Sequence, residues 1–441
     1  PGADTPTPTS TPTATPVPTR TPTPSPGVYA DDFESTGSGW PTVNTGTCSF
    51  GYTTAQGDGV YGVQPLVADQ VCIVGAPAAA QANGLYEVSA FKNGPNDGSI
   101  YGLGFGMDSP SARSLTQLYV LWIDPADQSY ALQKFVNGTW TTLNASNDWT
   151  NHTAIAGGGG VNRLRVRREG SEILIFVNGK FLERVMDDSL ADNGFVGLLN
   201  WAAYSSPAIA GFDDMRINQI RSVYADDFAQ VGSGWFHGQN SDCQASYSEG
   251  QYRTATAPGY LCFFGAPVSG LSNGRFDVEA RRGESFYQVA YGLYFRGNSD
   301  LSSFYALLVI PDTQQYALLQ YVEGVGWTSF TWDPELESGW LTSDRINTST
   351  SVNQLSAEVD GNLLRVFLNG TLLGSYTDST PLSGNRFGLI NWASQFDSAI
   401  VDFDNMNATA WDAVPALVDA ADGSPLSGSL PVPPEDMNPA E

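Results

Sequence analysis

Acidic and histidine side chains are the residues of this chain whose types could support catalysis. Hydrolysis of a glycosidic bond with retention needs two carboxyl groups about 5 Å apart. The acids in residues 183–188 and 335–337 do not have the spacing of such a pair, and neither set has a counterpart in the other half of the chain. His152 and His237 lie near no nucleophile motif, and no Ser-His-Asp order, phosphate-binding loop or His/Cys cluster is present. The sequence therefore predicts that the protein is not an enzyme.

Six aspartates lie near the predicted first and last strands of two similar halves of the chain and could bind a cation. Carboxylate and carbonyl oxygens are the usual ligands of Ca²⁺, and such strands are often adjacent in jelly rolls. A structural Ca²⁺ is therefore the one cofactor that the sequence predicts. Capping of turns by the same side chains is the alternative. The six residues are Asp31, Asp32, Asp213, Asp226, Asp227 and Asp404.

Tryptophan side chains could bind sugar rings, because an exposed ring face is a platform on which a sugar can stack. The candidates for such platforms are Trp122, Trp140, Trp149, Trp327, Trp332 and Trp340. Of these, Trp140 and Trp327 follow predicted turns and could belong to a platform or to the core. Two further pairs recur at equivalent positions of both halves and are expected in the core, namely Trp40 with Trp235 and Trp201 with Trp392.

An internal repeat relates the two halves of the chain. The motif Val-Tyr-Ala-Asp-Asp-Phe begins at Val28 and again at Val223. A closing Phe-Asp-Asp-Met motif at residues 212–215 returns as Phe-Asp-Asn-Met at residues 403–406. The 441 residues therefore contain two copies of one fold, each long enough to bury its own core.

Apolar runs and tight turns predict strands throughout both copies. Residues 162–167, 173–177 and 181–185 are separated by Glu-Gly and Asn-Gly turns, which predicts a three-stranded antiparallel meander. Another hairpin is expected from residues 119–123 and 130–136. No segment has sustained helical periodicity. The predicted fold class is all-β, with two tandem antiparallel jelly-roll β-sandwiches.

The pattern divides the chain into four segments. Residues 1–27 are expected to form a Thr/Pro-rich extended tail or stalk, 28–217 and 223–408 the two sandwiches, and 409–441 an acidic, Pro-rich tail. Because few residues join the sandwiches, we expect a restricted relative geometry. A small apolar patch around Trp411 is expected to dock on the second sandwich or on a neighbouring molecule.

The net charge of −26 argues against nucleic acid or anionic lipid as a partner, because binding phosphates needs clustered Lys and Arg. The densest basic run is expected to form a solvated face of one strand, and its members are Arg163, Arg165, Arg167 and Arg168. No stretch of 18 apolar residues is present, so no membrane span is expected. A surface rich in hydroxyls and amides is typical of extracellular β-proteins, with compositional bias of the source as the alternative.

The four cysteines fall at equivalent places of the two copies, Cys48 with Cys72 and Cys243 with Cys262. A disulfide within each pair would close a loop of about 20 residues and stabilise the fold by about 3 kcal/mol. Buried free thiols are the alternative, but an even number in repeated places favours disulfides. The expected location is therefore extracellular or at the cell surface, and a start at Pro1 favours either removal of a signal segment or a fragment.

Both copies resemble the concanavalin A-like lectin/glucanase superfamily, in particular bacterial modules related to laminin-G-like and family-16 glycoside hydrolase domains. The resemblance rests on Asp-Asp-Phe near a Gly-x-Gly-Trp start, on Asn-Gly turns at Asn137 and Asn178, and on the closing Phe-Asp-Asp/Asn-Met strand. It covers about residues 28–217 and 223–407 and implies a jelly roll. Hydrolases of the family take their carboxylates from a Glu-x-Asp-x-x-Glu strand, which this chain lacks.

Two kinds of glycosylation site are expected. Thr/Pro tracts are typical O-glycosylated stalks, and the candidate residues are Thr5, Thr7, Thr11, Thr15, Thr21 and Thr23. Among the Asn-x-Ser/Thr sequons, Asn144 and Asn151 are expected on the surface.

Three functions fit these observations. We favour a non-catalytic secreted or cell-surface structural or adhesive protein, such as a self-assembling filament subunit whose tails contact other copies of itself head to tail. A glycan-binding, lectin-like protein with a polysaccharide partner is the alternative, and an atypical glycosidase is the third. The first predicts a rigid link between the sandwiches, the second exposed tryptophans, and the third two facing acids in a groove.

Overall fold

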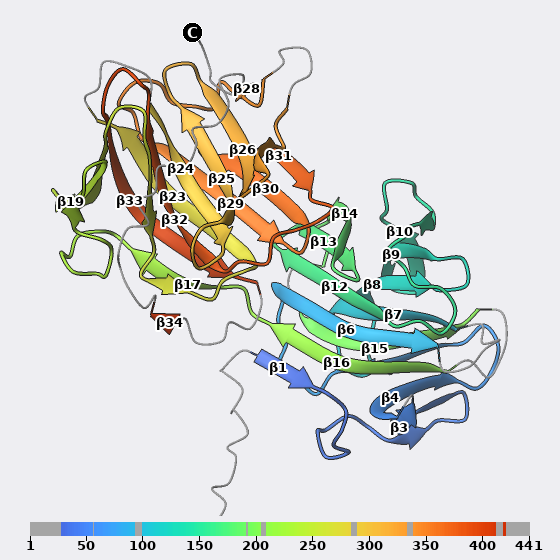
Figure 1. Cartoon of the computed structure of the whole chain (residues 1–441). Helices are drawn as coiled ribbons and strands as arrows, with labels where there is room; N and C mark the ends of the chain where they lie inside the picture. Colours follow the sequence, from blue (N-terminus) through green and yellow to red (C-terminus); the bar gives the residue numbers. More distant parts are fainter. Residues whose placement is uncertain are drawn as a thin grey trace, which may run out of the picture.

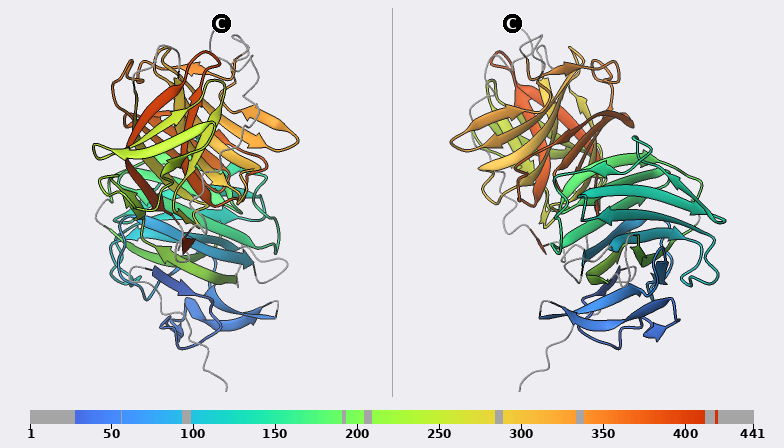
Figure 2. Two further views of the ribbon diagram at one scale, coloured as in Figure 1. Left: turned by 60° about the vertical axis from the view of Figure 1, so that its left-hand side comes forward. Right: turned by 90° about the vertical axis from the view of Figure 1, so that its right-hand side faces the viewer.

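The computed structural model describes residues 28–55, 57–92, 99–190, 193–203, 209–283, 289–332, 338–411 and 418–419. The described residues form two β-sandwiches that lie side by side (Figures 1 and 2). They contain no helix, and so none that could cross a membrane. The predicted all-β fold is confirmed. The Thr/Pro-rich tail and most of the acidic tail lie outside the described residues.

The first sandwich packs a nine-stranded sheet on a seven-stranded sheet. The nine strands are β1 (Val28–Asp31), β2 (Val43–Asn44), β3 (Cys48–Ala55), β4 (Asp58–Pro65), β6 (Gly84–Lys92), β12 (Asn162–Glu169), β13 (Glu172–Val177), β14 (Lys180–Met186) and β16 (Ala210–Asn218). Their order is β14-β13-β12-β6-β16-β4-β3-β2, with β1 paired to β16. The seven strands are β5 (Val71–Gly75), β7 (Ser99–Met107), β8 (Gln117–Asp124), β9 (Ser129–Val136), β10 (Thr139–Thr142), β11 (Thr150–Asn151) and β15 (Phe195–Ala202). Their order is β10-β9-β8-β7-β15-β5, with β11 paired to β9.

The second sandwich repeats this arrangement. Its nine-stranded sheet contains β17 (Arg221–Asp226), β18 (Gly238–Gln239), β19 (Cys243–Ser248), β20 (Gln251–Thr256), β23 (Gly274–Arg282), β29 (Asn353–Asp360), β30 (Leu363–Leu368), β31 (Thr371–Thr377) and β33 (Ala399–Ala410). The order is β18-β19-β20-β33-β23-β29-β30-β31, with β17 paired to β33. Its seven-stranded sheet contains β21 (Leu261–Gly265), β24 (Val289–Gly297), β25 (Ser303–Ile310), β26 (Gln315–Val322), β27 (Gly326–Ser329), β28 (Leu341–Thr342) and β32 (Arg386–Ala393), in the order β21-β32-β24-β25-β26-β27 with β28 on β26. A separate pair joins β22 (Val268–Ser269) to β34 (Val418–Asp419).

The predicted meander is present as β12, β13 and β14. Asn178 and Gly179 of the β13–β14 turn both have positive φ, 53° and 73°, which is the backbone conformation that an Asn-Gly hairpin turn requires. The predicted hairpin of residues 119–123 and 130–136 is present as β8 and β9. Turn chemistry in the sequence therefore fixed where these strands begin and end.

Alternation along β12 sends apolar side chains to the inside and charged ones to the outside. Leu164 and Val166 join the buried core between the two sheets, together with Tyr86 and Val88 of the neighbouring strand β6. The residues between them, such as Arg165, face away from that core. The outer face of the nine-stranded sheet therefore carries a row of arginines.

One disulfide connects the two sheets within each sandwich, and the bonded pairs are those expected from the sequence. Cys48 of β3 is bonded to Cys72 of β5, and Cys243 of β19 is bonded to Cys262 of β21. The two half-cystines are 24 residues apart in the first sandwich and 19 in the second. The described residues contain no free cysteine.

Candidate functional site

The two sandwiches meet through the outer faces of their nine-stranded sheets, where β13 and β14 approach β30 (Figure 1). Leu174 and Phe176 of β13 form a buried apolar cluster with Leu363 of β30. The backbone N–H of Phe181 donates to Asn362 Oδ1 at 2.9 Å across the interface. These contacts hold one sandwich in a defined position against the other.

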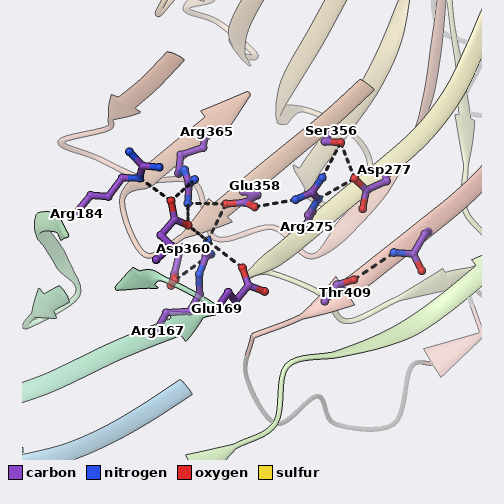
Figure 3. A network of polar contacts seen from close by, with 12 residues as sticks. Arg167, Glu169, Arg184, Arg275, Asp277, Ser356, Glu358, Asp360, Arg365 and Thr409 are labelled. Atoms are coloured by element: carbon purple, nitrogen blue, oxygen red, sulfur yellow. Dashed lines mark hydrogen bonds and ion pairs between the residues drawn. The ribbon is translucent and has the colours of Figure 1, made fainter. Parts of the chain in front are cut away.

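A buried network of ion pairs lies beside this cluster (Figure 3). The Arg167 side chain is 1% exposed and lies 2.8 Å from Glu358 Oε2 and 3.5 Å from Asp360 Oδ2. Its guanidinium carbon is 4.1 Å from the ring centroid of Trp411, a cation–π contact. A buried charge is costly unless it is paired. The second sandwich therefore supplies the partners that Arg167 of the first requires.

Glu172 of the first sandwich receives a bidentate contact from the second. Arg365 Nη1 and Nη2 donate to its two carboxylate oxygens at 2.8 and 2.9 Å, and Arg184 Nε donates at 2.5 Å. Burial alone would raise the pKa of Glu172, but the hydrogen bonds from Arg365 and Arg184 outweigh burial and lower it. A bidentate pair fixes relative orientation as well as supplying attraction.

The network shifts pKa values in both directions. Burial alone would lower the pKa of Arg167, but the charges of Glu358 and Asp360 outweigh it, and the pKa is raised. The pKa of Glu169 is also raised, because burial and the carboxylate of Glu358 outweigh the attraction of Arg167. Arg167 therefore keeps its charge inside the interface, whereas Glu169 takes up a proton more readily than a free glutamate.

The expectation that the arginine run forms a solvated face is wrong. Arg163 is exposed, but the other three members are buried: Arg165, Arg167 and Arg168. Alternation does direct Arg165 and Arg167 to the outer face of the sheet, but the second sandwich covers that part of the face. Arg168 points inward instead, where its guanidinium donates to the carbonyl of Leu190 at 2.5 Å.

A pocket of about 620 Å³ opens beside the network, on the outer face of the first nine-stranded sheet. Residues of β6, β12, β16 and the β13–β14 turn line it together with one residue of the second sandwich, and they are Glu87, Arg163, Arg165, Asn178, Gly179, Arg216, Asn218 and Asn273. Three arginines therefore face one carboxylate in a chain that is strongly acidic as a whole. No single stretch of the sequence indicates this pocket, because its residues come from strands far apart in the chain.

The aspartates predicted to bind calcium form turns at the start of each sandwich. Asp31 Oδ1 accepts a hydrogen bond from the backbone N–H of Phe33 at 2.9 Å, and Asp31 Oδ2 accepts one from the Tyr29 hydroxyl at 3.1 Å. Asp226 makes the same two contacts in the second sandwich. Turn formation thus accounts for these two residues.

The remaining aspartates of this set lie just after these turns or at irregular positions of the last strands β16 and β33. Asp32 and Asp227 are exposed, and Asp213 and Asp404 each accept a hydrogen bond from the next backbone N–H. The pKa values of Asp213 and Asp404 are raised by burial and by neighbouring carboxylates. Within the described ranges, no group of three or more His, Cys, Asp or Glu side chains is placed to hold a metal ion. A structural Ca²⁺ remains a prediction.

The acids considered for hydrolysis make structural contacts. Glu183 accepts a hydrogen bond from the Tyr130 hydroxyl at 3.2 Å, and Asp187 forms an ion pair with Lys134 at 2.6 Å. Residues 335–337 lie outside the described residues. Glu183 and Asp187 thus have partners that connect neighbouring strands or loops, whereas Asp188 is exposed.

The two histidines lie in unrelated surroundings. His152 Nδ1 accepts a hydrogen bond from the backbone N–H of Ala154 at 3.1 Å, and burial lowers the pKa of His152. His237 stacks on Tyr247 with ring centroids 6.1 Å apart. In the described part of the chain, neither histidine forms an ion pair with an acid that could orient it.

The six tryptophans proposed as sugar platforms differ in exposure. Trp122 and Trp340 are buried in apolar clusters on the outer faces of the seven-stranded sheets, so neither offers a free ring face. Trp149 and Trp327 are half-buried, whereas Trp140 and Trp332 are 38% and 47% exposed. Stacking on a sugar needs an exposed face, so the candidates narrow to the last two. The predicted core position is confirmed for Trp40, Trp235 and Trp392, while Trp201 is half-buried.

One of the two predicted N-glycosylation sites is not on the surface. Asn144 is 2% exposed, and its Oδ1 accepts a hydrogen bond from the backbone N–H of Leu132 at 2.6 Å. The expectation of a surface position at Asn144 is therefore wrong, because the side chain serves a turn. Asn151 is exposed. The threonines of residues 1–27 lie outside the described residues.

No family model matches the sequence, and no curated protein matches it. The fold is similar to carbohydrate-binding module CBM66 from Bacillus subtilis, with a TM-score of 0.32 and 16% identity over 40% of this chain and 94% of that one. It is similar to the Bacillus licheniformis β-glucanase, with a TM-score of 0.31 and 12% identity over 44% and 98% of the two chains. It is also similar to the kappa-carrageenase from Pseudoalteromonas carrageenovora, with a TM-score of 0.33 and 10% identity over 44% of this chain and 95% of that one. Similarity of this degree carries no conclusion about superfamily or activity.

Proposed function

We propose that this protein is a non-catalytic structural or adhesive protein of the cell exterior, in which two sandwiches act as one rigid unit. The observation that carries the proposal is the buried network between Arg167, Glu172, Glu358 and Arg365. A hinge would need an interface that water can enter, whereas this one buries charges that must stay paired. The two disulfides are compatible with an extracellular location.

Assembly of such units head to tail into a filament is the finer form of this proposal. A contact between different surfaces of two copies propagates as a fibre when its rotation does not close a ring. The Thr/Pro-rich segment of residues 1–27 is the part of the chain that we propose to contact the next copy, because its prolines favour an extended form that can lie on a surface.

Deletion of residues 1–27 tests this assembly. The full chain is expected to form filaments in negative-stain images and large species in light scattering, and the deletion variant is expected to remain monomeric. A second variant that lacks residues 421–441 shows whether the C-terminal tail, which is also expected to contact another copy, contributes to assembly. Filaments of unchanged length after removal of residues 1–27 would exclude this tail from assembly.

Glycan binding is a second candidate function, and the exposed Trp140 favours it. The ring of Trp140 packs at 4.9 Å from Phe135 and at 6.1 Å from Trp122, so the exposed indole is held in place by two further aromatic rings. A rigid, exposed indole costs little entropy when a sugar stacks on it. The sugar-related names of similar structures agree with this candidate but do not carry it.

Binding to an array of neutral and acidic polysaccharides tests the second candidate. Replacement Trp140→Ala is expected to weaken any glycan signal several-fold, whereas Val325→Ala, at another exposed apolar side chain, should leave the signal unchanged. If the full chain binds no glycan, or if both variants bind equally well, Trp140 is not a platform.

A further inference from the structure

The pocket between the sandwiches is built from three adjacent strands in register. Arg216 of β16 lies opposite Glu87 of β6, and Glu87 lies opposite Arg165 of β12. On the outer face these side chains form one row across the sheet. Asn218 stands two residues beyond Arg216 on the same face of β16. Cationic donors and a buried amide therefore converge on one space of about 620 Å³.

The arginines of the pocket differ in how their charge is balanced. Arg165 forms an ion pair with Asp360 of the second sandwich at 2.7 Å, and Arg163 pairs with Glu87. Arg216 is exposed, and its side chain forms neither an ion pair nor a hydrogen bond with any residue that the structure describes. One arginine that lines the pocket is thus without an ion pair in the described structure. An anion placed there would find a ready partner.

Asn218 has an unused acceptor inside the same pocket. The residue is 4% exposed, and its Oδ1 accepts no hydrogen bond from any residue that the structure describes. Buried amide oxygens nearly always have a donor, so we take the orphan oxygen of this lining residue as an acceptor for a bound ligand. A ligand for this site therefore needs an anionic group for Arg216 and a hydroxyl group for Asn218.

The second copy of the fold lacks these features at the equivalent positions. Since β12 and β29 both begin with the matched asparagine, Arg163 corresponds to Gln354. The closing Phe-Asp-Asp/Asn-Met motif aligns Arg216 with Asn407 and Asn218 with Thr409. The scaffold does not require arginine or asparagine at these positions. The pocket chemistry is specific to the first copy.

We propose that this pocket binds an acidic sugar, whose carboxylate or sulfate group contacts Arg216 and Arg163 and whose hydroxyl group donates to Asn218 Oδ1. A sugar acid combines an anion for the arginines with a hydroxyl donor for Asn218. Arginine binds both carboxylate and sulfate oxygens well, so an experiment has to distinguish a carboxylated sugar from a sulfated one. The inference does not rest on filament assembly, which is measured separately.

Isothermal titration of the full chain with four probes tests the proposal. The probes are digalacturonate, galactose 6-sulfate, neutral galactobiose and hexaglutamate. We expect one of the two acidic sugars to bind and neutral galactobiose not to bind. The difference between the first two probes shows whether the site prefers carboxylate or sulfate, and hexaglutamate shows whether any acidic peptide suffices.

The pocket residues of the first copy can be replaced by the residues that the second copy has at the equivalent positions. Arg216→Asn and Asn218→Thr are each expected to weaken binding of the acidic sugar by about tenfold or more, because each removes a contact that the ligand makes in the pocket. Arg113→Asn removes an exposed arginine elsewhere and should have no effect. Because the Arg216 side chain has no partner in the described structure, Arg216→Asn should also leave the melting temperature unchanged.

Three results would each overturn the proposal. The first is that neither acidic sugar binds to the full chain. The second is that hexaglutamate binds as tightly as the better sugar, since the site would then recognise an acidic peptide. The third is that Arg216→Asn and Arg113→Asn bind with equal affinity, since the sugar would then occupy another place.

Discussion

Arg167 of β12 and Glu358 of β29 occupy the same position in the two copies of the fold, and their side chains form a buried ion pair 2.8 Å long. Both strands begin with the matched asparagine, Asn162 or Asn353, and the two residues follow it by the same number of positions. Two identical copies would place like charges against each other here. The exchange of arginine for glutamate is what allows the copies to pack together.

Reversal of one charge should disrupt this interface. Arg167→Glu would bury a second carboxylate against Glu358 and is expected to lower the free energy of unfolding by about 3 to 5 kcal/mol, measured in urea. The double variant Arg167→Glu with Glu358→Arg should recover only part of the loss, since Asp360 and Arg365 keep their charges. The double variant should lose less free energy of unfolding than the sum of the losses in the two single variants. If its loss equals that sum, Arg167 and Glu358 do not interact across the interface.

Alanine substitutions at two glycines in equivalent turns can distinguish the effect of backbone strain from the effect of contact between the sandwiches. Gly170 and Gly361 both have φ of +59°, so alanine at either is expected to cost about 1 to 2 kcal/mol. A Cβ at Gly361 would also lie 2.7 Å from the carbonyl oxygen of Gly179 in the other sandwich, whereas a Cβ at Gly170 meets nothing within 4 Å. Gly361→Ala should therefore destabilise the protein more than Gly170→Ala in thermal unfolding. Equal losses would show that the turns do not touch in solution.

Asp187 should make stability depend on pH in acid. Burial alone would raise its pKa, but hydrogen bonds from Lys134 and Ser189 outweigh burial and lower the pKa to about 2. Because the pKa in the folded protein lies below the ordinary aspartate value of 3.8, the stabilisation is fully present above that pH and is lost as the pH falls towards 2. Asp187→Asn should flatten the unfolding free energy over this range, and Glu323→Gln, at an exposed acid, should not. A curve for Asp187→Asn with the slope of the parent would contradict the assignment.

The two disulfides should contribute nearly equally to the free energy of unfolding. Their loops are 24 and 19 residues long, and the chain-entropy model gives about 3 kcal/mol for each. Replacing Cys48 and Cys72 by serine, or Cys243 and Cys262 by serine, should lower the free energy of unfolding by similar amounts. A reducing agent should have no further effect on a variant that lacks both bonds.

The sequence was a good guide to the strands because local chemistry determines where they end. Asn178 and Gly179 adopt the positive φ values that their residue types allow, and the apolar runs on both sides of them form β13 and β14. The disulfide pairs could be predicted for a similar reason, since matched cysteines in two copies leave few alternatives. These features need no knowledge of distant segments.

The interface and the pocket could not be predicted in the same way. A period of two assigns Arg165 to the outside of the sheet, but it does not say whether water or another sandwich lies there. The sequence does contain a relevant difference, since Arg167 in the first copy is replaced by Glu358 in the second. This difference indicates an ion pair only once the two sheets are known to pack on each other. Asn144 was assigned to the surface for the opposite reason, because a sequon carries no information about burial.

Each sandwich starts and finishes on neighbouring strands. Val28 of β1 lies opposite Asn218 of β16, and Arg221 of β17 lies opposite Ala410 of β33. Tension applied between the two ends of the first sandwich therefore pulls β1 away from β16 and ruptures the ladder one rung at a time. A force directed along the strands would instead load all the hydrogen bonds between them at once, and a much larger force would be needed to break the pair. A fibre built from such units would lengthen under load by unzipping β1 before any sandwich broke.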